Sequence, residues 1–189
     1  LKSITDDKEI EDRFYKDLTF GTGGIRGIRG VGTNRINKYV VRKATQGLAN
    51  YMLSVNKEHA LKKGIIIAHD CRIGSREYAL NTARVMAGNG IKAYIYKDLR
   101  STPELSFGVR EMGCMSGIVV TASHNPRHWN ALKLLNEEGE FLTKEDGNEV
   151  LDIAEKEDFE FSDVDNLGKY TDDDTFNQRH IDSVLSLNL

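Results

Sequence analysis

Short runs of consecutive apolar residues alternate along the chain with longer stretches in which apolar residues recur every three or four positions. The short runs have the length and composition of buried strands. They cover residues 64–69, 91–96 and 117–121. Helical spacing is found over residues 6–18, 40–55 and 75–87. Because strands and helices alternate, we predict an α/β fold of three layers, in which a mostly parallel mixed sheet carries helices on both faces.

Capping residues indicate where further helices begin and end. Ser75 is expected to cap one helix, and Thr102 to cap the next, which stops at Gly113. Thr143 and Asp146 have the spacing of a capping box and open another helix.

The composition changes near residue 155. Over residues 155–174 nine acidic residues face only two lysines, which is typical of a solvated connector. The run Asp172-Asp173-Asp174 is interpreted in the same way, as a charged linker and not a metal site. A final helix is predicted from Phe176 onward. We therefore expect one domain over residues 1–154, followed by an acidic linker and helix over residues 155–189 that lead toward a missing second domain.

The overall charge argues for a small, soluble partner. With 26 basic and 29 acidic residues the net charge is -3, so neither nucleic acid nor a membrane surface is an expected partner. No apolar stretch approaches the roughly 20 residues of a membrane-spanning helix, and no leader is recognisable. Cys71 and Cys114 are too few for a disulfide framework, so we expect a cytoplasmic protein with two free thiols.

A glycine-rich segment, with six glycines over residues 21–32, is predicted to be a loop and not a strand. Its glycines let backbone N–H groups approach an anion closely, and Arg26 adds a planar fork of donors. The spacing fits neither a Walker A loop nor a dinucleotide fingerprint. Two interpretations stay open at this point: a generic phosphate loop, or a hairpin that only turns the chain.

The apolar run that ends at residue 121 passes directly into the polar turn Ser123-His124-Asn125-Pro126. Ligands of open α/β sheets bind outside the carboxyl ends of the strands, which is where Ser123 is expected. Pro126 prevents a helical continuation and keeps this turn stiff. The alternative is an ordinary turn whose side chains bond their own backbone. A metal site at His124 and His128 is disfavoured, because Pro126 separates them.

Lys133 follows ten residues after Ser123, in a predicted hairpin formed by residues 131–135 and 140–142. This position is close enough for its side chain to point back toward the same end of the sheet as Ser123. Most lysines are simply solvated surface residues, so the position alone does not assign a role.

Taken together, these segments resemble the phosphohexomutase superfamily over about residues 12–142, and within it the branch of the phosphoglucomutases and phosphopentomutases. A phosphomannomutase or phosphopentomutase is the alternative within this superfamily. The similarity is carried by the phosphoserine loop Thr121-Ala-Ser-His-Asn-Pro126, by Asn130 and Lys133 in an N-G-x-K context, and by Phe20 to Gly27. One departure is Ala131, which stands where the family has glycine. A methyl group there is expected to tighten the loop or shift Lys133.

The resemblance implies a mechanism in which Ser123 carries a phosphoryl group at rest. Thr22, Arg26, Ser123, His124 and Lys133 would bind phosphate, and His124 and Lys133 would assist proton transfer and charge stabilisation. The implied substrates are hexose phosphates, namely glucose 1-phosphate and glucose 6-phosphate, with glucose 1,6-bisphosphate as intermediate and activator. Mg²⁺ would bridge the phosphate on Ser123 and aspartates elsewhere in the protein.

The resemblance also implies four domains, of which this chain is the first. The second domain's metal loop, D-G-D-x-D-R, occurs nowhere in this sequence. The remaining mutase domains are therefore expected partners, and the isolated chain is expected to be inactive or nearly so. The alternative function is a non-catalytic phosphate- or nucleotide-binding α/β module. A serine hydrolase is disfavoured, because the G-x-S-x-G elbow is absent.

Overall fold

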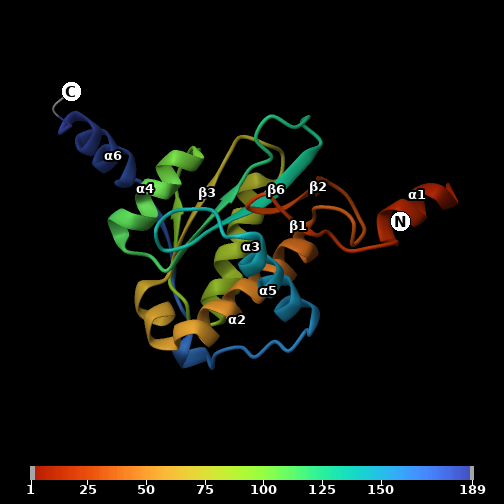
Figure 1. Cartoon of the computed structure of the whole chain (residues 1–189), viewed down its shortest axis with the longest axis horizontal. Coiled ribbons are helices and arrows are strands. Elements are labelled where there is room, and N and C mark those ends of the chain that lie inside the picture. Colours follow the sequence, from red (N-terminus) through yellow and green to blue (C-terminus); the bar gives the residue numbers. More distant parts are fainter. Residues whose placement is uncertain (1–2, 188–189) are drawn as a thin grey trace.

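The computed structural model describes residues 3–187, which form a sheet flanked by helices (Figure 1). The strands, in chain order, are Phe20–Gly21 (β1), Gly24–Ile28 (β2), Ile65–His69 (β3), Ala93–Tyr96 (β4), Ser116–Val120 (β5), Trp129–Leu135 (β6) and Tyr170–Asp173 (β7). The helices are Asp7–Phe14 (α1), Lys38–Lys63 (α2), Ser75–Gly88 (α3), Thr102–Met112 (α4), Lys144–Glu155 (α5) and Phe176–Leu185 (α6), with a short 3-10 turn over Val164–Asn166 (η1).

All seven strands belong to one mixed sheet of order β1-β2-β6-β5-β3-β4-β7. The central strands β5, β3 and β4 are parallel, and β7 extends them in parallel beside β4. On the other side, β6 turns back antiparallel to β5, and β2 and β1 continue antiparallel. The predicted mixed α/β sheet is thus confirmed, with as many antiparallel as parallel pairings among residues 3–187.

Helices cover both faces of this sheet and complete the three predicted layers (Figure 1). Alternate residues of β3 point to opposite sides: Ile65 and Ile67 pack in a core with α2, α3 and α5, whereas Ile66 packs with α4. Phe176, at the start of α6, is buried in this second core beside Tyr96. Because β3 is buried on both faces, it appears in the sequence as a continuous apolar run and not as an alternating one.

The first helix is shorter than predicted, and none of its residues is buried. Its apolar residues Ile10 and Phe14 stay more than a third exposed, and Leu18 lies beyond its end. The spacing therefore predicts the helix correctly but does not tell that its apolar face stays partly exposed.

Two predicted helix caps are each displaced by one residue. The cap of α3 is Gly74, whose left-handed φ of 86° suits glycine. The hydroxyl of Ser75 is instead buried and donates to Asp70. The cap of α4 is Ser101, which forms a complete capping box with Glu104. Thr143 caps α5 as predicted.

The prediction that the glycine-rich segment is a loop is wrong, because the segment contributes to the two strands β1 and β2. The error has a physical reason: β2 exists because it pairs with β6, a partner more than a hundred residues away, and local pattern does not reveal such pairing. The predicted hairpin after β6 is reduced on its second side to a single bridge between Leu135 and Phe141.

The acidic segment is also more ordered than a solvated connector. Its residues Tyr170–Asp173 form the edge strand β7, and two acidic side chains in and directly after this strand have basic partners. Asp172 binds Arg76 at 2.6 Å, and Asp174 lies 3.3 Å from Lys97. The expected domain boundary after residue 154 stays a prediction.

No helix among residues 3–187 combines the length and the apolar character needed to cross a bilayer.

Candidate functional site

The polar turn after β5 has a defined and strained geometry. Ser123 has a positive φ of 54°, a left-handed backbone conformation that residues other than glycine rarely adopt. Its backbone N–H donates to Oγ1 of Thr121 at 3.0 Å, and the N–H of Asn125 donates to the carbonyl of Ala122 at 3.0 Å. The Ser123 side chain is exposed, and its Oγ lies 3.4 Å from Nδ1 of His124. The turn thus presents a hydroxyl to solvent with an imidazole beside it.

The pairing of β2 with β6 brings the glycine-rich segment to this turn. In the antiparallel register Gly24 lies opposite Lys133, and Arg26 lies opposite Ala131. Arg26 and Lys133 are therefore diagonal neighbours on the pair of strands, within reach of each other's side chains. Nη1 of Arg26 donates to Oδ1 of Asn125 at 3.0 Å, which ties the β2 arginine to the turn that carries the serine.

Lys133 is partly buried, and its ammonium group lies 4.9 Å from the centre of the Phe141 ring. Burial, together with the positive charge of Arg26, lowers the pKa of Lys133 below its ordinary value. Ala131, which the resemblance to the family marks as a departure, is buried and lies opposite Arg26 in the strand pair. The predicted effect of its methyl group on Lys133 stays a prediction.

These residues surround one hollow of about 400 Å³ at the carboxyl end of β5. Its lining consists of Thr19, Gly21, Thr22, Gly24, Ile25, Arg26, Ser123, His124, Ala131 and Lys133. All five side chains predicted from the sequence to bind phosphate are among them. The hollow contains two cationic groups and no carboxylate, so it suits an anion.

Two residues that sequence reasoning did not single out support the serine turn from outside the hollow. Arg72 donates to backbone carbonyls of the turn, and Asp70 lies 3.2 Å from the Nε of Arg72. A signal for them was available: the D-x-R pattern directly follows the buried strand β3, at the same sheet edge as Ser123.

No three His, Cys, Asp or Glu side chains within residues 3–187 converge in a way that would hold a metal ion. The described residues thus do not by themselves make the Mg²⁺ site that the resemblance implies, and that site stays a prediction, in which a phosphate on Ser123 would supply an oxygen ligand.

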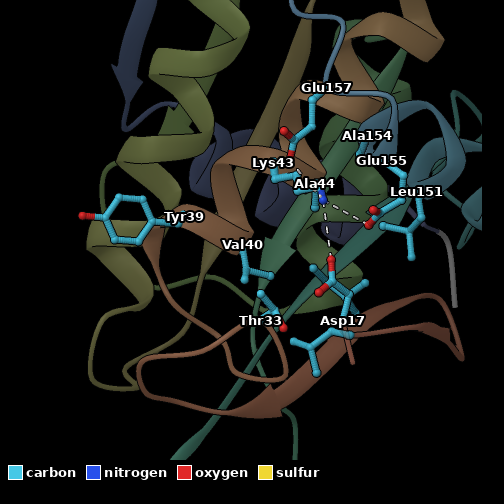
Figure 2. Close-up of a pocket in the computed structure, with 12 residues that line it drawn as sticks. Asp17, Thr33, Tyr39, Val40, Lys43, Ala44, Leu151, Ala154, Glu155 and Glu157 are labelled. Atoms are coloured by element: carbon cyan, nitrogen blue, oxygen red, sulfur yellow. Dashed lines mark hydrogen bonds and ion pairs between the residues drawn. The ribbon is translucent and has the colours of Figure 1, made fainter. Parts of the chain in front are cut away.

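A second hollow, of about 190 Å³, lies between the segment before β1, helix α2 and the end of α5 (Figure 2). The ammonium group of Lys43, one of the lining side chains, lies 3.5 Å from Asp17, 3.1 Å from Glu155 and 3.4 Å from Glu157. These polar groups bind one another and join three segments of the chain. We interpret this cluster as a structural clasp.

Comparisons with known proteins identify the family to which this fold is similar. The family model described as phosphoglucomutase/phosphomannomutase, alpha/beta/alpha domain I, matches residues 17–161. Phosphoglucomutase of Staphylococcus saprophyticus is 43% identical over 139 residues, which are 74% of this chain and 24% of that protein. A Staphylococcus aureus phosphoglucomutase is 40% identical over 135 residues, which are 71% of this chain and 24% of that protein. The chain thus spans about a quarter of the length of these relatives.

Solved structures share the fold at lower sequence identity. A protein named as a candidate phosphomannomutase, from Thermus thermophilus, superposes with a TM-score of 0.75 at 22% identity, covering 90% of this chain and 36% of that one. A phosphoglucomutase/phosphomannomutase family protein of Burkholderia thailandensis gives a TM-score of 0.70 at 20% identity, covering 91% and 36%. From the family match and the closeness of the staphylococcal relatives, the chain belongs to the phosphoglucomutase/phosphomannomutase family, as its α/β/α domain I.

Proposed function

We propose that this chain is the phosphoserine-carrying domain of a phosphoglucomutase, which interconverts glucose 1-phosphate and glucose 6-phosphate through a bisphosphate. The observation that carries the proposal is the meeting of Ser123, Arg26 and Lys133 around one hollow. Since the chain spans about a quarter of its staphylococcal relatives, turnover requires the remaining domains. The 189 residues alone are expected to give no measurable mutase activity.

Charge is the main physical argument for a phosphoryl group on Ser123. A phosphoserine carries about -1.5 to -2 charges and three strong acceptor oxygens. Arg26 offers a planar fork of donors and Lys133 a point charge, and both line the hollow into which Ser123 opens. Phosphoryl transfer depends mostly on positioning and charge stabilisation, which is what such an arrangement supplies.

The proposed transfer exchanges one P–O bond for another. A hydroxyl of the sugar phosphate attacks the phosphorus, the bond between phosphorus and Ser123 Oγ breaks, and a bond to the sugar oxygen forms. The sugar hydroxyl gives up its proton, and Oγ receives one. His124, with Nδ1 at 3.4 Å from Oγ, is placed to hold or release a proton at that oxygen. The bisphosphate then turns round, and Ser123 takes back the other phosphoryl group.

Phosphate mapping tests this proposal. The complete mutase is incubated with glucose 1,6-bisphosphate and Mg²⁺, and its intact mass and phosphorylated peptide are determined. We expect one added phosphate on Ser123, and loss of both phosphate and turnover in Ser123→Ala. Ser54→Ala is the matched control, because Ser54 is an exposed serine that bonds only its own helix.

The outcomes separate the two candidate functions. A Ser123→Ala enzyme with wild-type turnover excludes Ser123 as the carrier. A protein that binds the bisphosphate but acquires no phosphate would be the non-catalytic binding module, with Ser123 as an ordinary turn residue.

A further inference from the structure

Arg72 contacts the serine turn at an unusual number of points. Its Nη2 donates to the carbonyls of Ser123 and Asn125, each at 2.6 Å. Its Nη1 donates to the carbonyls of Pro126 at 2.9 Å and Trp129 at 3.3 Å. One guanidinium group therefore binds four backbone carbonyls across the segment that joins β5 to β6.

The Arg72 side chain is itself oriented by a polar network of Asp70, Ser75 and Asn130. Asp70 Oδ2 lies 3.2 Å from Nε of Arg72, and Asp70 Oδ1 accepts the Arg72 backbone N–H at 2.9 Å. The same Oδ1 accepts from the Ser75 hydroxyl at 2.7 Å, and that hydroxyl accepts from Nδ2 of Asn130 at 2.9 Å. Because Ser75 and Asn130 are buried, the position of Arg72 is determined by the ends of β3, α3 and β6.

This arrangement separates Arg72 from the phosphate-binding cations. Each of its three side-chain nitrogens already has a protein partner, its side chain is 13% exposed, and it does not line the hollow. Its contacts instead offset two local costs. Left-handed backbone is unfavourable at a residue other than glycine, and carbonyls that lose contact with water without gaining a donor are unfavourable as well. The carbonyl of Ser123 and the carbonyl of Asn125 both accept from Arg72, which is not among the residues that line the hollow.

We propose that Arg72, oriented by Asp70, is a positioning residue that holds the Ser123 turn in its left-handed conformation and so presents Oγ to the hollow. The part of this inference that concerns turnover rests on the proposed function. The part that concerns the turn does not, and the two are tested separately.

The first experiment measures amide hydrogen exchange in the 189-residue chain. We compare Arg72→Met and Arg72→Lys with the control Arg76→Met, since Arg76 also binds a carboxylate and a backbone carbonyl but not the serine turn. We expect exchange at Ser123 and Asn125 to accelerate by about tenfold or more in Arg72→Met. Amides of β3 should be unchanged, which verifies that the variant is folded.

Lysine distinguishes positioning from charge. It keeps the positive charge but cannot supply the planar fork that reaches four carbonyls. We therefore expect the exchange rates of the turn amides in Arg72→Lys to be closer to those in Arg72→Met than to those in the parent chain. Wild-type exchange in either Arg72 variant, or equal acceleration in Arg76→Met, would overturn the inference.

The second experiment uses the complete mutase. For Arg72→Lys we expect kcat to fall by roughly 10- to 100-fold with KM for the sugar phosphate changed by less than about threefold, because misplacing a reacting atom costs rate more than binding. A wild-type kcat in Arg72→Lys would show that the positive charge alone is sufficient, and it would overturn the inference. If instead Ser123→Ala retains turnover while exchange responds as predicted, the proposed function fails and the positioning of the turn by Arg72 stands.

Discussion

Replacement of Gly24 by alanine should separate β2 from β6 and destabilise the fold. A Cβ added at Gly24 would lie 1.9 Å from the carbonyl oxygen of Leu132 and 2.8 Å from Cα of Lys133. Both are backbone atoms of β6, so no side chain can rotate to make room. Ordinary contact begins at 3.4 Å, and the strands would therefore have to move apart by about 1.5 Å.

The expected destabilisation follows from this movement. Overpacking of a well-packed site costs about 1–3 kcal/mol, and each backbone hydrogen bond lost from the ladder adds about 0.5–1.5 kcal/mol. We expect the free energy of unfolding to fall by about 2–4 kcal/mol. With a urea m-value of about 2 kcal/mol/M, the unfolding midpoint should decrease by about 1–2 M.

Gly21→Ala is the matched control within the same glycine-rich segment. The nearest atom to a Cβ at Gly21 is the carbonyl oxygen of Gly24 at 3.7 Å, which is ordinary contact. Both substitutions restrict the unfolded chain to a similar extent, so their difference isolates the clash. Urea unfolding can be followed by the fluorescence of Trp129, the only tryptophan, which lies in β6 opposite Ile28. Equal midpoints for the two variants would refute the reasoning.

Three further results follow from local environments. Gly47→Ala should destabilise the protein in urea unfolding, because the new Cβ would lie 2.4 Å from a backbone oxygen of α5. This clash should outweigh the helix preference of alanine over glycine, which is about 1 kcal/mol. A stabilised variant would contradict the reasoning. Burial raises the pKa of the Cys114 thiol to about 12, so at a mildly alkaline pH a thiol-specific disulfide reagent should modify exposed Cys71 first and Cys114 only after unfolding. Arg26→Gln should raise the pKa of Lys133 part of the way to 10.5 in an NMR titration, the effect of burial remaining; an unchanged pKa would exclude repulsion by Arg26.

Elements buried on both faces were the most predictable part of the fold. The strands β3 and β5 appear as uninterrupted apolar runs because both of their faces are covered, and the observed bounds differ from the predicted ones by one residue at most at each end. Gly113 ends α4 with a left-handed φ of 58°, as its position in the sequence indicates. In these places the local pattern and the tertiary environment impose the same structure.

The strands that were missed depend on distant partners. In β2 the glycines lower the intrinsic preference for a strand, yet Gly24 is required because the backbone of β6 approaches so closely. At β7 the run of three acidic residues, of which the first two lie in the strand and the third follows it, suggests a solvated linker. They are compatible with an edge strand because one side is open to water and Arg76 and Lys97 supply counter-charges.

The residues of the candidate site divide in a similar way. Ser123, Arg26 and Lys133 stand in recognisable motifs, and the structure brings all three to one hollow. Arg72 stands only in the short D-x-R pattern that follows β3, which hydrophobic periodicity does not single out. Its importance depends on the sheet order, which places the end of β3 beside the end of β5, and the order of strands is not a local property of the sequence.

The lowered pKa of Lys133 connects the geometry of the site to its proposed occupant. Two cations on diagonal positions of one strand pair repel each other, and burial strips water from one of them, so without an anion the arrangement is unfavourable. A dianion on the oxygen of Ser123 would reverse the sign of this local energy, because each cation would then face opposite charge in a partly desolvated hollow. Arg72 cannot take this role, since its donors are already bound to backbone carbonyls. In the two proposals, the cations assigned to the anion and the cation assigned to the turn therefore differ in where their donors point.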